Sequence, residues 1–468
     1  MKKREIIEGV IKDYDFPNKG SFELDGKKVI VKGALPGQKV SCMVSKVRKD
    51  KAEARLLDVL ERSEIEDAVP PCPQFGICGG CAYQTMSYEH QLELKAGQVK
   101  KLLDGVIDSE THPYDWEGII GSPVTTAYRN KMEYSFGDEY KDGPLVLGLH
   151  KKNSMYDIVP VCNCVIVSED YNRIVSYTME FARAHGLSYH KKMQHVGLLR
   201  HLVLRQSKTN GGLLVNLVTS TDGLENLDLN AYVEGLLALP LDGTIVGILH
   251  TANDSLADAV VPEKVTLLYG RDYIEEEVLG LHFQISPFSF FQTNTKSAER
   301  LYSKAREYAG DTKDKLIFDL YSGTGTIAQI IAPVADKVVG VEIVEEAVEA
   351  AKENAAGNGL KNCEFIAGDV LNVIGELKDK PDLIILDPPR DGIHPKALDK
   401  IIDFGVDRMV YISCKPTSLT RDLVVLQERG YKLEKACAVD MFPSTANCET
   451  VVLLSKGEVD SIPVVQGN

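Results

Sequence analysis

The second half of the chain alternates short apolar runs with amphipathic helical stretches, and this alternation limits the possible folds more than any other feature. Between residues 295 and 456, apolar runs end in polar loops at KLIFDLYSGTG, KVVGVEIV, CEFIAGDV, DLIILDPPR and RMVYISC. Strands that alternate with helices build a mostly parallel sheet with helices on both faces. The sequence therefore predicts a doubly wound α/β domain. Its last two runs, YKLEKACAVDMF and CETVVLLSK, predict an antiparallel hairpin at the sheet edge.

The loop after the first run carries glycines at the place where such a sheet binds its ligand. Gly323 and Gly325 lie between a strand and a helix, where glycine lets backbone amides approach a ligand closely. Glu342 ends the next strand and can accept hydrogen bonds from ribose hydroxyls. Asp369 ends the third strand and can accept from an adenine amine. A dinucleotide dehydrogenase would usually have a third glycine where Ala328 stands, whereas the acidic strand ends resemble the S-adenosylmethionine-dependent methyltransferase fold.

A single cysteine, Cys414, follows the fifth apolar run. A cysteine at the end of an apolar strand is more often a small buried hydrophobic residue than a nucleophile. The carboxyl ends of parallel strands, however, line the ligand crevice. Lys415 and Arg421 follow closely in the sequence, and positive charge favours a thiolate. The position of Cys414 therefore favours a nucleophile.

Motifs along nearly the whole chain resemble the RNA uracil-5-methyltransferase family. They are YRNKMEYSFG (128–137), GLLRHLVLR (197–205), FFQTN (290–294), DPPRDG, SCKPTSLTRDL and DMFPSTANCETVVLL. The resemblance implies that Cys414 is the nucleophile and Glu449 the general base. The cofactor-binding positions that it implies are Gln292, Tyr321, Glu342 and Asp387. Asn447 stands where the family commonly has histidine, and Lys415 stands where asparagine often follows the nucleophile.

The implied chemistry explains why a thiol and a carboxylate are needed together. Carbon 5 of uracil is too weak a nucleophile to take a methyl group from a sulfonium unaided. A thiolate that adds to carbon 6 makes an enolate, whose carbon 5 can attack the methyl group. A general base then removes the proton from carbon 5, and the cysteine is eliminated. Without the resemblance, Glu449 would be interpreted as a surface carboxylate at the start of a strand.

A second group of cysteines lies far upstream, in the segment PCPQFGICGGC, at positions Cys72, Cys78 and Cys81. A fourth cysteine is available at Cys162 or Cys164, and four thiolates suit zinc and an iron–sulfur cluster equally well. The family resemblance implies a 4Fe–4S cluster with Cys164 as the fourth ligand, because the family ligand usually precedes an asparagine, here Asn172, by eight positions. Radical methylthiotransferases require Cys-x3-Cys-x2-Cys, whereas the first spacing here is five residues. We therefore expect this cluster to be structural or to face RNA.

The N-terminal residues differ in charge from the rest of the chain. Residues 1–56 hold 14 Lys or Arg against 8 Asp or Glu, whereas the whole chain has a formal charge of −15. Short strands between glycine turns predict a small β-barrel over 1–60, similar to a TRAM or OB domain. A basic module on an acidic body is typical of an RNA-binding appendage, although a solvated charged surface is the alternative. The barrel is predicted to contact the RNA backbone together with Arg129, Lys131, Arg200 and Arg205.

The chain as a whole is predicted to be a multidomain α/β protein. The barrel (1–60) is followed by a central mixed α+β iron–sulfur and RNA-recognition domain (65–285), a Rossmann-like methyltransferase domain (286–456) and a tail (457–468). The helix predicted at 88–106 is expected to pack on the catalytic domain. No apolar stretch is long enough to span a bilayer, and no signal core follows the charged N-terminus. We therefore expect a cytoplasmic monomer with reduced thiols.

The predicted function is the S-adenosylmethionine-dependent methylation of carbon 5 of a uridine in 23S ribosomal RNA. The target uridine must leave its stack to reach Cys414. The combination of barrel and cluster favours ribosomal RNA, since the transfer-RNA branch of the family typically lacks both. Two alternatives are the same chemistry on transfer RNA and a non-catalytic iron–sulfur RNA-binding protein.

Overall fold

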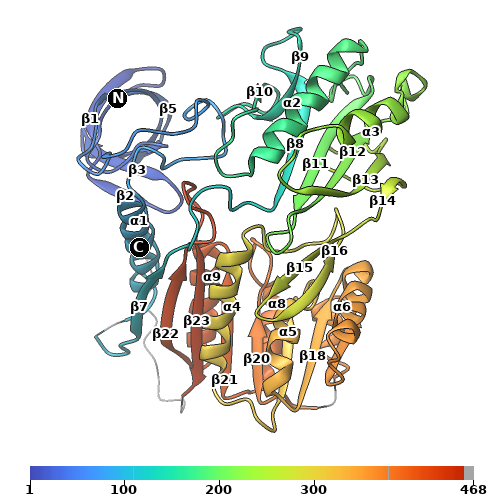
Figure 1. Ribbon diagram of the computed structural model, residues 1–468. Helices are drawn as coiled ribbons and strands as arrows, with labels where there is room; N and C mark the ends of the chain where they lie inside the picture. Colours follow the sequence, from blue (N-terminus) through green and yellow to red (C-terminus); the bar gives the residue numbers. More distant parts are fainter. Residues whose placement is uncertain (109, 378, 458–468) are drawn as a thin grey trace.

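The computed structural model describes residues 1–108, 110–377 and 379–457, which are arranged in three parts, each built on a β-sheet (Figure 1). The first two parts lie side by side above the third, which holds the C-terminal half of the chain. Of the predicted tail at 457–468, residues 458–468 lie outside the described residues. Among the described helices, none is both long enough and apolar enough to cross a bilayer.

The N-terminal part is a curved six-stranded sheet. Its strands are β1 (Ile6–Val10), β2 (Asp13–Asp15), β3 (Lys19–Leu24), β4 (Lys27–Lys32), β5 (Lys39–Val47) and β6 (Lys51–Glu61), in the order β1-β5-β6-β4-β3-β2. Burial alternates along the strands, as at Val29 and Val31 of β4, because successive side chains point to opposite faces. Gly9 lies against the ring of Phe22, where a Cβ would come within 2.3 Å of a ring carbon, so the glycine lets β1 and β3 approach one another.

The central part is a seven-stranded sheet in the order β10-β9-β8-β11-β12-β13-β14. Its strands are β8 (Lys131–Asp138), β9 (Leu145–His150), β10 (Ile158–Pro160), β11 (Leu199–Gln206), β12 (Gly212–Thr219), β13 (Thr244–Ala252) and β14 (Lys264–Gly270). Helices α2 (Glu169–Ala184) and α3 (Leu229–Leu237) pack on one face, where Ile174 and Leu236 join the core of the sheet (Figure 1). A hairpin of β15 (Ile274–Val278) and β16 (Leu281–Ile285) leads into the third part.

The third part is a doubly wound sheet in the order β19-β18-β17-β20-β21-β23-β22-β7. Its strands are β17 (Leu316–Leu320), β18 (Lys337–Glu342), β19 (Cys363–Ala367), β20 (Leu383–Leu386), β21 (Arg408–Ser413), β22 (Tyr431–Val439), β23 (Glu449–Lys456) and β7 (Asp115–Ile120). The five strands from β19 to β21 are parallel, as predicted.

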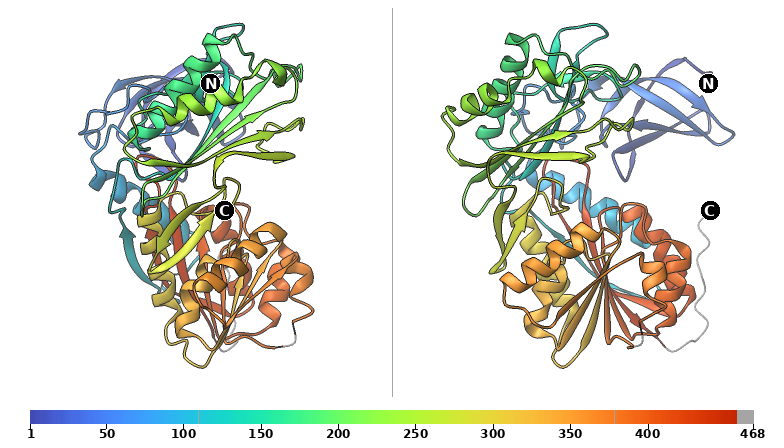
Figure 2. Two further views of the ribbon diagram at one scale, coloured as in Figure 1. Left: turned by 45° about the vertical axis from the view of Figure 1, so that its right-hand side comes forward. Right: turned by 90° about the vertical axis from the view of Figure 1, so that its right-hand side faces the viewer.

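Helices cover both faces of this sheet, which is seen edge-on in the right-hand view of Figure 2. One face carries α4 (Thr295–Ala309), α5 (Thr326–Ile331) and α6 (Glu345–Gly357). The other carries α1 (Tyr88–Asp104), α7 (Val370–Val373), α8 (Pro395–Asp403) and α9 (Pro416–Glu428). The sheet therefore has a separate apolar core on each face.

One prediction about this sheet needs correction. The hairpin of β22 and β23 does not form its edge, because β7 pairs in parallel with β22 and lies outside it. Helix α1 packs its Val99 and Leu103 into the same apolar core as α9, as expected for the helix predicted at 88–106. Helix α1 and strand β7 of the predicted 65–285 domain thus pack with the third part. Ser87 caps α1, since its hydroxyl accepts a hydrogen bond from the amide of His90.

Candidate active site

The loop after β17 has the backbone shape that the glycine pattern predicts. Gly323 and Gly325 have φ of 54° and 70°, in the left-handed region that glycine favours. At Gly325 a side chain is also excluded, because a Cβ would come within 2.5 Å of the Phe365 ring. Tyr321 adopts φ of 67° without being glycine. This local strain turns the chain sharply at the carboxyl end of the strand.

Glu342 ties this loop to the end of β18. Its carboxylate accepts hydrogen bonds from the amide of Gly323 (2.9 Å) and from that of Val344 (3.0 Å). A carboxylate has about four acceptor positions, so Glu342 keeps lone pairs for the hydroxyls of a ligand. Asp369 caps α7 by accepting from the amide of Leu371 at 2.8 Å. Both acidic residues therefore hold rigid loop ends at the same edge of the sheet.

A cavity of about 2170 Å³ lies at this edge. Its lining includes all but one of the predicted catalytic and cofactor-binding residues, namely Gln292, Tyr321, Gly323, Glu342, Asp369, Asp387, Cys414 and Glu449. Gly325 is the exception, since it packs against Phe365 instead. The cavity exceeds the roughly 300–1000 Å³ typical of a small-molecule pocket. It therefore has room for a nucleotide-sized cofactor and a second large ligand.

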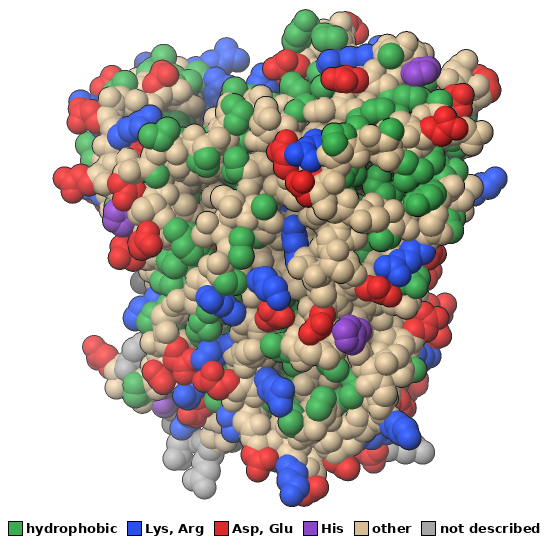
Figure 3. All heavy atoms as spheres, viewed as in Figure 1, with side chains coloured by type: hydrophobic (Ala, Val, Ile, Leu, Met, Phe, Trp, Pro, Cys, Tyr) green, Lys and Arg blue, Asp and Glu red, His purple; other side chains and the backbone are tan. Residues whose placement is uncertain are grey.

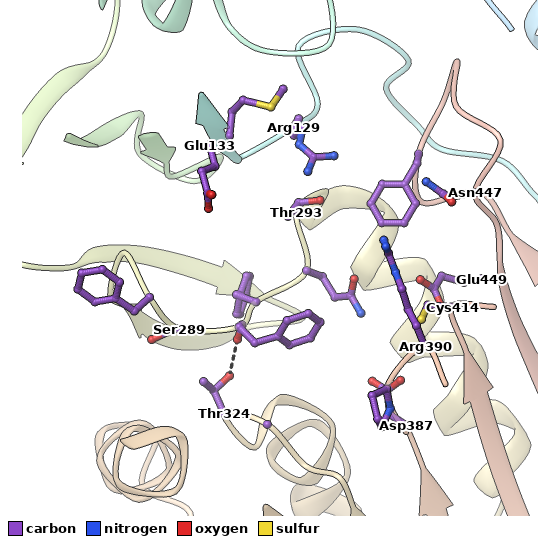
Figure 4. A pocket seen from close by; sticks show the side chains of 18 of the residues that line it. Arg129, Glu133, Ser289, Thr293, Thr324, Asp387, Arg390, Cys414, Asn447 and Glu449 are labelled. Carbon is purple, nitrogen blue, oxygen red and sulfur yellow. Dashed lines mark hydrogen bonds between the residues drawn. The ribbon is translucent and has the colours of Figure 1, made fainter. Parts of the chain in front are cut away.

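Strand pairing brings Cys414 and Glu449 together. In the antiparallel pair of β21 and β23, Ser413 lies opposite Thr450, so the next residue of each strand end, Cys414 and Glu449, meet at the cavity. Figure 4 shows both side chains beside those of Asp387 and Arg390. Asp387 follows β20, the strand next to β21. A thiol, two carboxylates and one cation thus gather at three neighbouring strand ends.

The charges of this group act on one another. Burial, with the carboxylates of Glu449 and Asp387, raises the pKa of Cys414 to about 11, and Arg390 opposes the rise. Burial and Asp387 raise the pKa of Glu449 to about 8, again opposed by Arg390. Burial alone raises the pKa of Asp387 to about 7. The group thus carries more carboxylates than cations, and a positively charged ligand would favour both the thiolate and the carboxylates.

The cation that faces Cys414 is Arg390, and not the predicted Lys415 or Arg421. Lys415 points to Asp391 at 4.0 Å, and Arg421 forms an ion pair with Asp422 at 2.8 Å and donates to the carbonyl of Asp391. Sequence reasoning missed Arg390 because DPPR was interpreted as a loop that carries Asp387. The arginine at the end of that motif was the available signal.

The FFQTN loop is held by the central part of the protein. Asn130, from the YRNKMEYSFG motif, donates from its side chain to the carbonyl of Gln292 (3.0 Å) and to Thr295 (2.9 Å). Its backbone amide donates to the carbonyl of Thr293 at 2.8 Å. Asn130 therefore positions Gln292 at the cavity, a role that the sequence did not reveal.

Two of the four central-domain side chains predicted to contact RNA have a structural role instead. Arg205 is buried and donates to the carbonyls of Pro287 and Ser289. Arg200 is also buried and donates to carbonyls of the loop after β13, at Asn253 (2.7 Å), Ser255 (2.8 Å) and Ala257 (2.7 Å).

The other two predicted side chains lie nearer the surface. Arg129 lines the cavity, so it stays available to a ligand. Burial and the charge of Arg205 lower the pKa of Lys131 to about 8. The neighbouring guanidinium thus lowers the affinity of Lys131 for a proton, whereas Arg129 keeps its charge at the cavity.

The upstream cysteines gather beside the same cavity, which Cys81 lines. Burial and the nearby thiols of Cys164, Cys78 and Cys72 raise the pKa of Cys81 to about 12. Burial, Cys72 and Cys78 raise that of Cys164 to about 11. The backbone amide of Cys164 donates to the side chain of Asn172 at 2.9 Å. Within the described residues, however, no three cysteine, histidine or acidic side chains are placed to hold one metal ion, so the structure supports neither the zinc nor the 4Fe–4S interpretation.

The fold and the strand-end site define a methyltransferase of the S-adenosylmethionine-dependent fold class. A family model described as tRNA (Uracil-5-)-methyltransferase matches residues 260–457. An uncharacterised RNA methyltransferase of Clostridium acetobutylicum is 50% identical over 97% of this chain and 99% of its own length. One from Caldanaerobacter subterraneus is 48% identical over 97% and 100%. The chain belongs to the RNA uracil-5-methyltransferase family and is an RNA methyltransferase.

A solved structure is similar over nearly the full chain. It is a tRNA (uracil-54, C5)-methyltransferase of Pyrococcus abyssi in complex with S-adenosyl-L-homocysteine, with a TM-score of 0.73 and 26% identity. The match covers 96% of this chain and 100% of that one. The likeness therefore includes the N-terminal and central parts as well as the catalytic sheet.

Proposed function

We propose that this protein methylates carbon 5 of a uridine in RNA through a covalent bond between Cys414 and carbon 6 of the uracil. One observation carries the proposal. Cys414 and Glu449 lie at the ends of two paired strands and line the same cavity as the loops that carry Glu342 and Asp369. The family to which the chain belongs acts on the same carbon.

Cys414, Glu449 and Arg390 each have a role in this reaction. The thiolate of Cys414 adds to carbon 6, and the electron pair moves through carbon 5 to the carbonyl as an enolate. Carbon 5 would then take the methyl group from the sulfonium of S-adenosylmethionine, whose bond from sulfur to the methyl carbon breaks and leaves a neutral thioether. Before transfer, the positive charge of the sulfonium would offset the carboxylates of the site. Glu449 then takes the proton from carbon 5, the double bond re-forms, and the bond from sulfur to carbon 6 breaks. Arg390 favours the charged forms of Cys414 and Glu449 throughout.

The residues of the nucleotide loops fit the proposed methyl donor. The Glu342 carboxylate, with acceptor positions to spare, would accept from its ribose hydroxyls, and Asp369 would accept from its adenine amine. The φ angles of Gly323 and Gly325 let the backbone of the first loop approach it. Gln292, Tyr321 and Asp387 line the remainder of the cavity near Cys414.

Replacing Arg390 should change the pH dependence of covalent addition. Only the thiolate adds to uracil, so the rate rises with pH up to the pKa of Cys414. Because Arg390 lowers that pKa, we expect Arg390→Met to move the pH profile of adduct formation upward and to slow the reaction at pH 7. The measurement is the rate of trapping on RNA that contains 5-fluorouridine. Arg390→Lys retains the charge, and an unchanged profile in Arg390→Met would show that Arg390 does not act on the thiol.

We propose that RNA reaches this cavity along a row of cations on the barrel. On the face shown in Figure 3, acidic and basic side chains are mixed, so the attraction to RNA depends on local groups. Lys19, Lys32 and Arg55 are exposed and lie directly opposite one another on β3, β4 and β6. Like charges in this arrangement are destabilising, and a bound phosphate chain would relieve the repulsion.

The row continues into the cavity. Lys32 and Lys152 both line the cavity. Lys152 also lies close to the chain beside Lys32, since a Cβ added to Gly33 would be 3.3 Å from the Nζ of Lys152. Burial and the charge of Lys32 lower the pKa of Lys152. Ion pairs on the outer face of the barrel involve other residues, such as Lys28 with Asp13 and Asp15. These four cations thus lead from the barrel surface toward Cys414.

Removing the row should weaken RNA binding in a salt-dependent way. The triple variant Lys19→Gln, Lys32→Gln, Arg55→Gln should reduce the slope of log affinity against log salt by about 2, since each phosphate contact contributes about 0.7 for single strands. The control is Lys313→Gln with Lys361→Gln, two exposed lysines of the catalytic part. Equal slopes for the triple variant and the control would contradict the proposed path.

We propose that Cys72, Cys78, Cys81 and Cys164 bind a 4Fe–4S cluster. The proposal is supported by the mutual electrostatic effect of these thiols, since Cys164, Cys78 and Cys72 all act on Cys81. Burial and the negative charge of neighbouring thiolates raise the pKa values of Cys81 and Cys164, and iron would hold both residues as thiolates.

The purified protein should be brown and contain iron. We expect Cys78→Ala to lose the colour and the iron, and Cys162→Ala to retain both, because the thiol of Cys162 is not among those that act on Cys81 and Cys164. The measurement is the visible absorption spectrum with metal analysis. A colourless protein that holds zinc would overturn the cluster proposal.

We propose 23S ribosomal RNA as the substrate, on the presence of a basic barrel and a four-cysteine group. Transfer RNA is the second candidate, and the observation that favours it is the likeness of nearly the whole chain to the Pyrococcus abyssi tRNA enzyme. Mass mapping of 5-methyluridine in both RNA classes from a deletion strain would decide between them. Loss of the methyl group from transfer RNA alone would refute the ribosomal assignment.

A further inference from the structure

The loop that precedes Glu449 is held by several residues that are far away in the sequence. This base loop, residues 440–448, joins β22 to β23 and contributes Phe442, Thr445, Ala446 and Asn447 to the cavity lining. Its shape therefore sets where Glu449 enters the cavity. Ser444, at its centre, has φ of 67°, a left-handed conformation that a residue other than glycine keeps only when its surroundings impose it.

The segment directly after the cysteine group imposes that conformation. The backbone amides of Ala82 and Tyr83 both donate to the carbonyl of Ser444, at 2.8 and 3.0 Å. The amide of Ser444 donates to Oε1 of Gln91 at 2.8 Å, and Nε2 of Gln91 donates to the carbonyl of Met86 at 3.0 Å. Gln91 is buried on α1. Both polar groups of the Ser444 backbone are thus satisfied by residues 82–91.

Further contacts hold the loop on either side of Ser444. Tyr128 donates its hydroxyl hydrogen to the carbonyl of Pro443 at 3.0 Å. Lys95 donates to the carbonyl of Phe442 at 3.0 Å and forms an ion pair with Asp440 at 2.8 Å, with both side chains fully buried. A buried pair of this kind fixes a geometry more than it stabilises the fold. The base loop therefore has contacts with distant residues at each position from Phe442 to Ser444.

The same segment also contacts the barrel. Tyr83 packs with Tyr14 and Leu35 of the N-terminal part, and Ala446 of the base loop packs against this apolar group. The hydroxyls of Tyr14 and Tyr83 lie 3.1 Å apart and share a hydrogen bond. A continuous set of contacts thus runs from the barrel, past the cysteine group, to the loop that ends at Glu449.

We propose that residues 82–91 are a positioning element for Glu449. These residues contact the barrel on one side and the base loop on the other, and so they fix the place from which Glu449 removes the proton. The inference rests on the proposed function, because it assigns Glu449 the role of base. Covalent addition depends on Cys414 at the end of β21, which these residues do not hold. Loss of the positioning element should therefore slow proton removal more than addition.

The test compares Gln91→Met with Gln98→Met. Both glutamines are buried on α1, but within the described residues the side chain of Gln98 has no hydrogen-bond partner. With unmodified RNA, Gln91→Met should accumulate the methylated covalent enzyme–RNA adduct and should release product about 10- to 100-fold more slowly, since small misplacements of a catalytic group have effects on this scale. Trapping on 5-fluorouridine RNA should proceed at the wild-type rate. Hydrogen–deuterium exchange should increase in the peptide that covers 440–448.

Two outcomes separate the failure of this inference from the failure of the proposed function. If Gln91→Met behaves like Gln98→Met in product release and in exchange, the positioning inference is wrong. If the wild-type protein itself forms no adduct with 5-fluorouridine RNA, the proposed function fails instead. Should Gln91→Met not fold, Tyr83→Phe removes the hydrogen bond between this element and Tyr14 of the barrel with little change in shape, and the same two measurements apply to it.

Discussion

Cys414→Ala should abolish methyl transfer to RNA, with a loss of about a million-fold, the scale seen when a catalytic nucleophile is removed. Without the thiolate, carbon 5 of the uracil has no route to the enolate that attacks the methyl group. The fold should survive, because Cys414 is only partly buried at the mouth of the sheet. The measurement is the incorporation of labelled methyl groups into RNA under single-turnover conditions.

The matched control is Cys363→Ala. Cys363 also lies on a strand of the parallel sheet and is partly buried, but it does not line the cavity. This variant should methylate RNA at close to the wild-type rate. Methyl transfer by Cys414→Ala at a rate comparable with that of Cys363→Ala would mean that the reaction needs no covalent step at Cys414.

Glu449→Gln should stop the reaction after the methyl group has been transferred. Glutamine has the same shape but cannot accept the proton from carbon 5, so the enzyme should remain bound to methylated RNA. Product formation should fall by about a thousand-fold, within the range for a general base. The measurement is the fraction of protein in a denaturation-resistant adduct with ordinary, non-fluorinated RNA.

The pH dependence of proton removal has the corresponding sign. The pKa of Glu449 is raised to about 8, and a base acts only when deprotonated, so the step accelerates as the pH rises toward that value. Binding of the cationic methyl donor would move the acceleration to lower pH. Normal turnover by Glu449→Gln, or an absence of accumulated adduct, would assign the base to another residue.

The strand ends of the parallel sheet could be predicted from the sequence, and the reason is local. Each apolar run and the polar residues directly after it are neighbours in the chain, so Glu342, Asp387 and Cys414 fall at one edge of the sheet by topology alone. Glu449 needed the family resemblance, because its antiparallel pairing with β21 depends on a register that no local pattern gives. The burial that shifts its pKa likewise arises only in the folded protein.

What the sequence did not reveal depends on contacts between distant segments. β7 pairs with β22 across more than three hundred residues of chain, and nothing in DWEGII distinguishes it from a strand of the central part. Arg200 and Arg205 were assigned to RNA because basic side chains are the usual ligands of the RNA backbone. All eight residues of β11 are buried, so both guanidinium groups bind carbonyls instead.

The base loop shows the same limit. The sequence places Asp440 to Cys448 just before Glu449, but the residues that hold this loop come from α1, from the segment after Cys81 and from Tyr128. The upstream cysteine group thus contacts the region of the catalytic centre through the residues that follow it. Its position beside the cavity is more informative about its role than the metal-like spacing of its thiols.

The most direct test is to incubate the protein and S-adenosylmethionine with RNA containing 5-fluorouridine, and to map the resulting adduct by mass spectrometry of its peptides. Fluorine at carbon 5 prevents proton removal, so the covalent intermediate should persist. We predict a nucleotide that carries the transferred methyl group and is attached to the peptide containing Cys414. An adduct on any other cysteine, or methylated RNA with no protein attached, would contradict the proposed reaction.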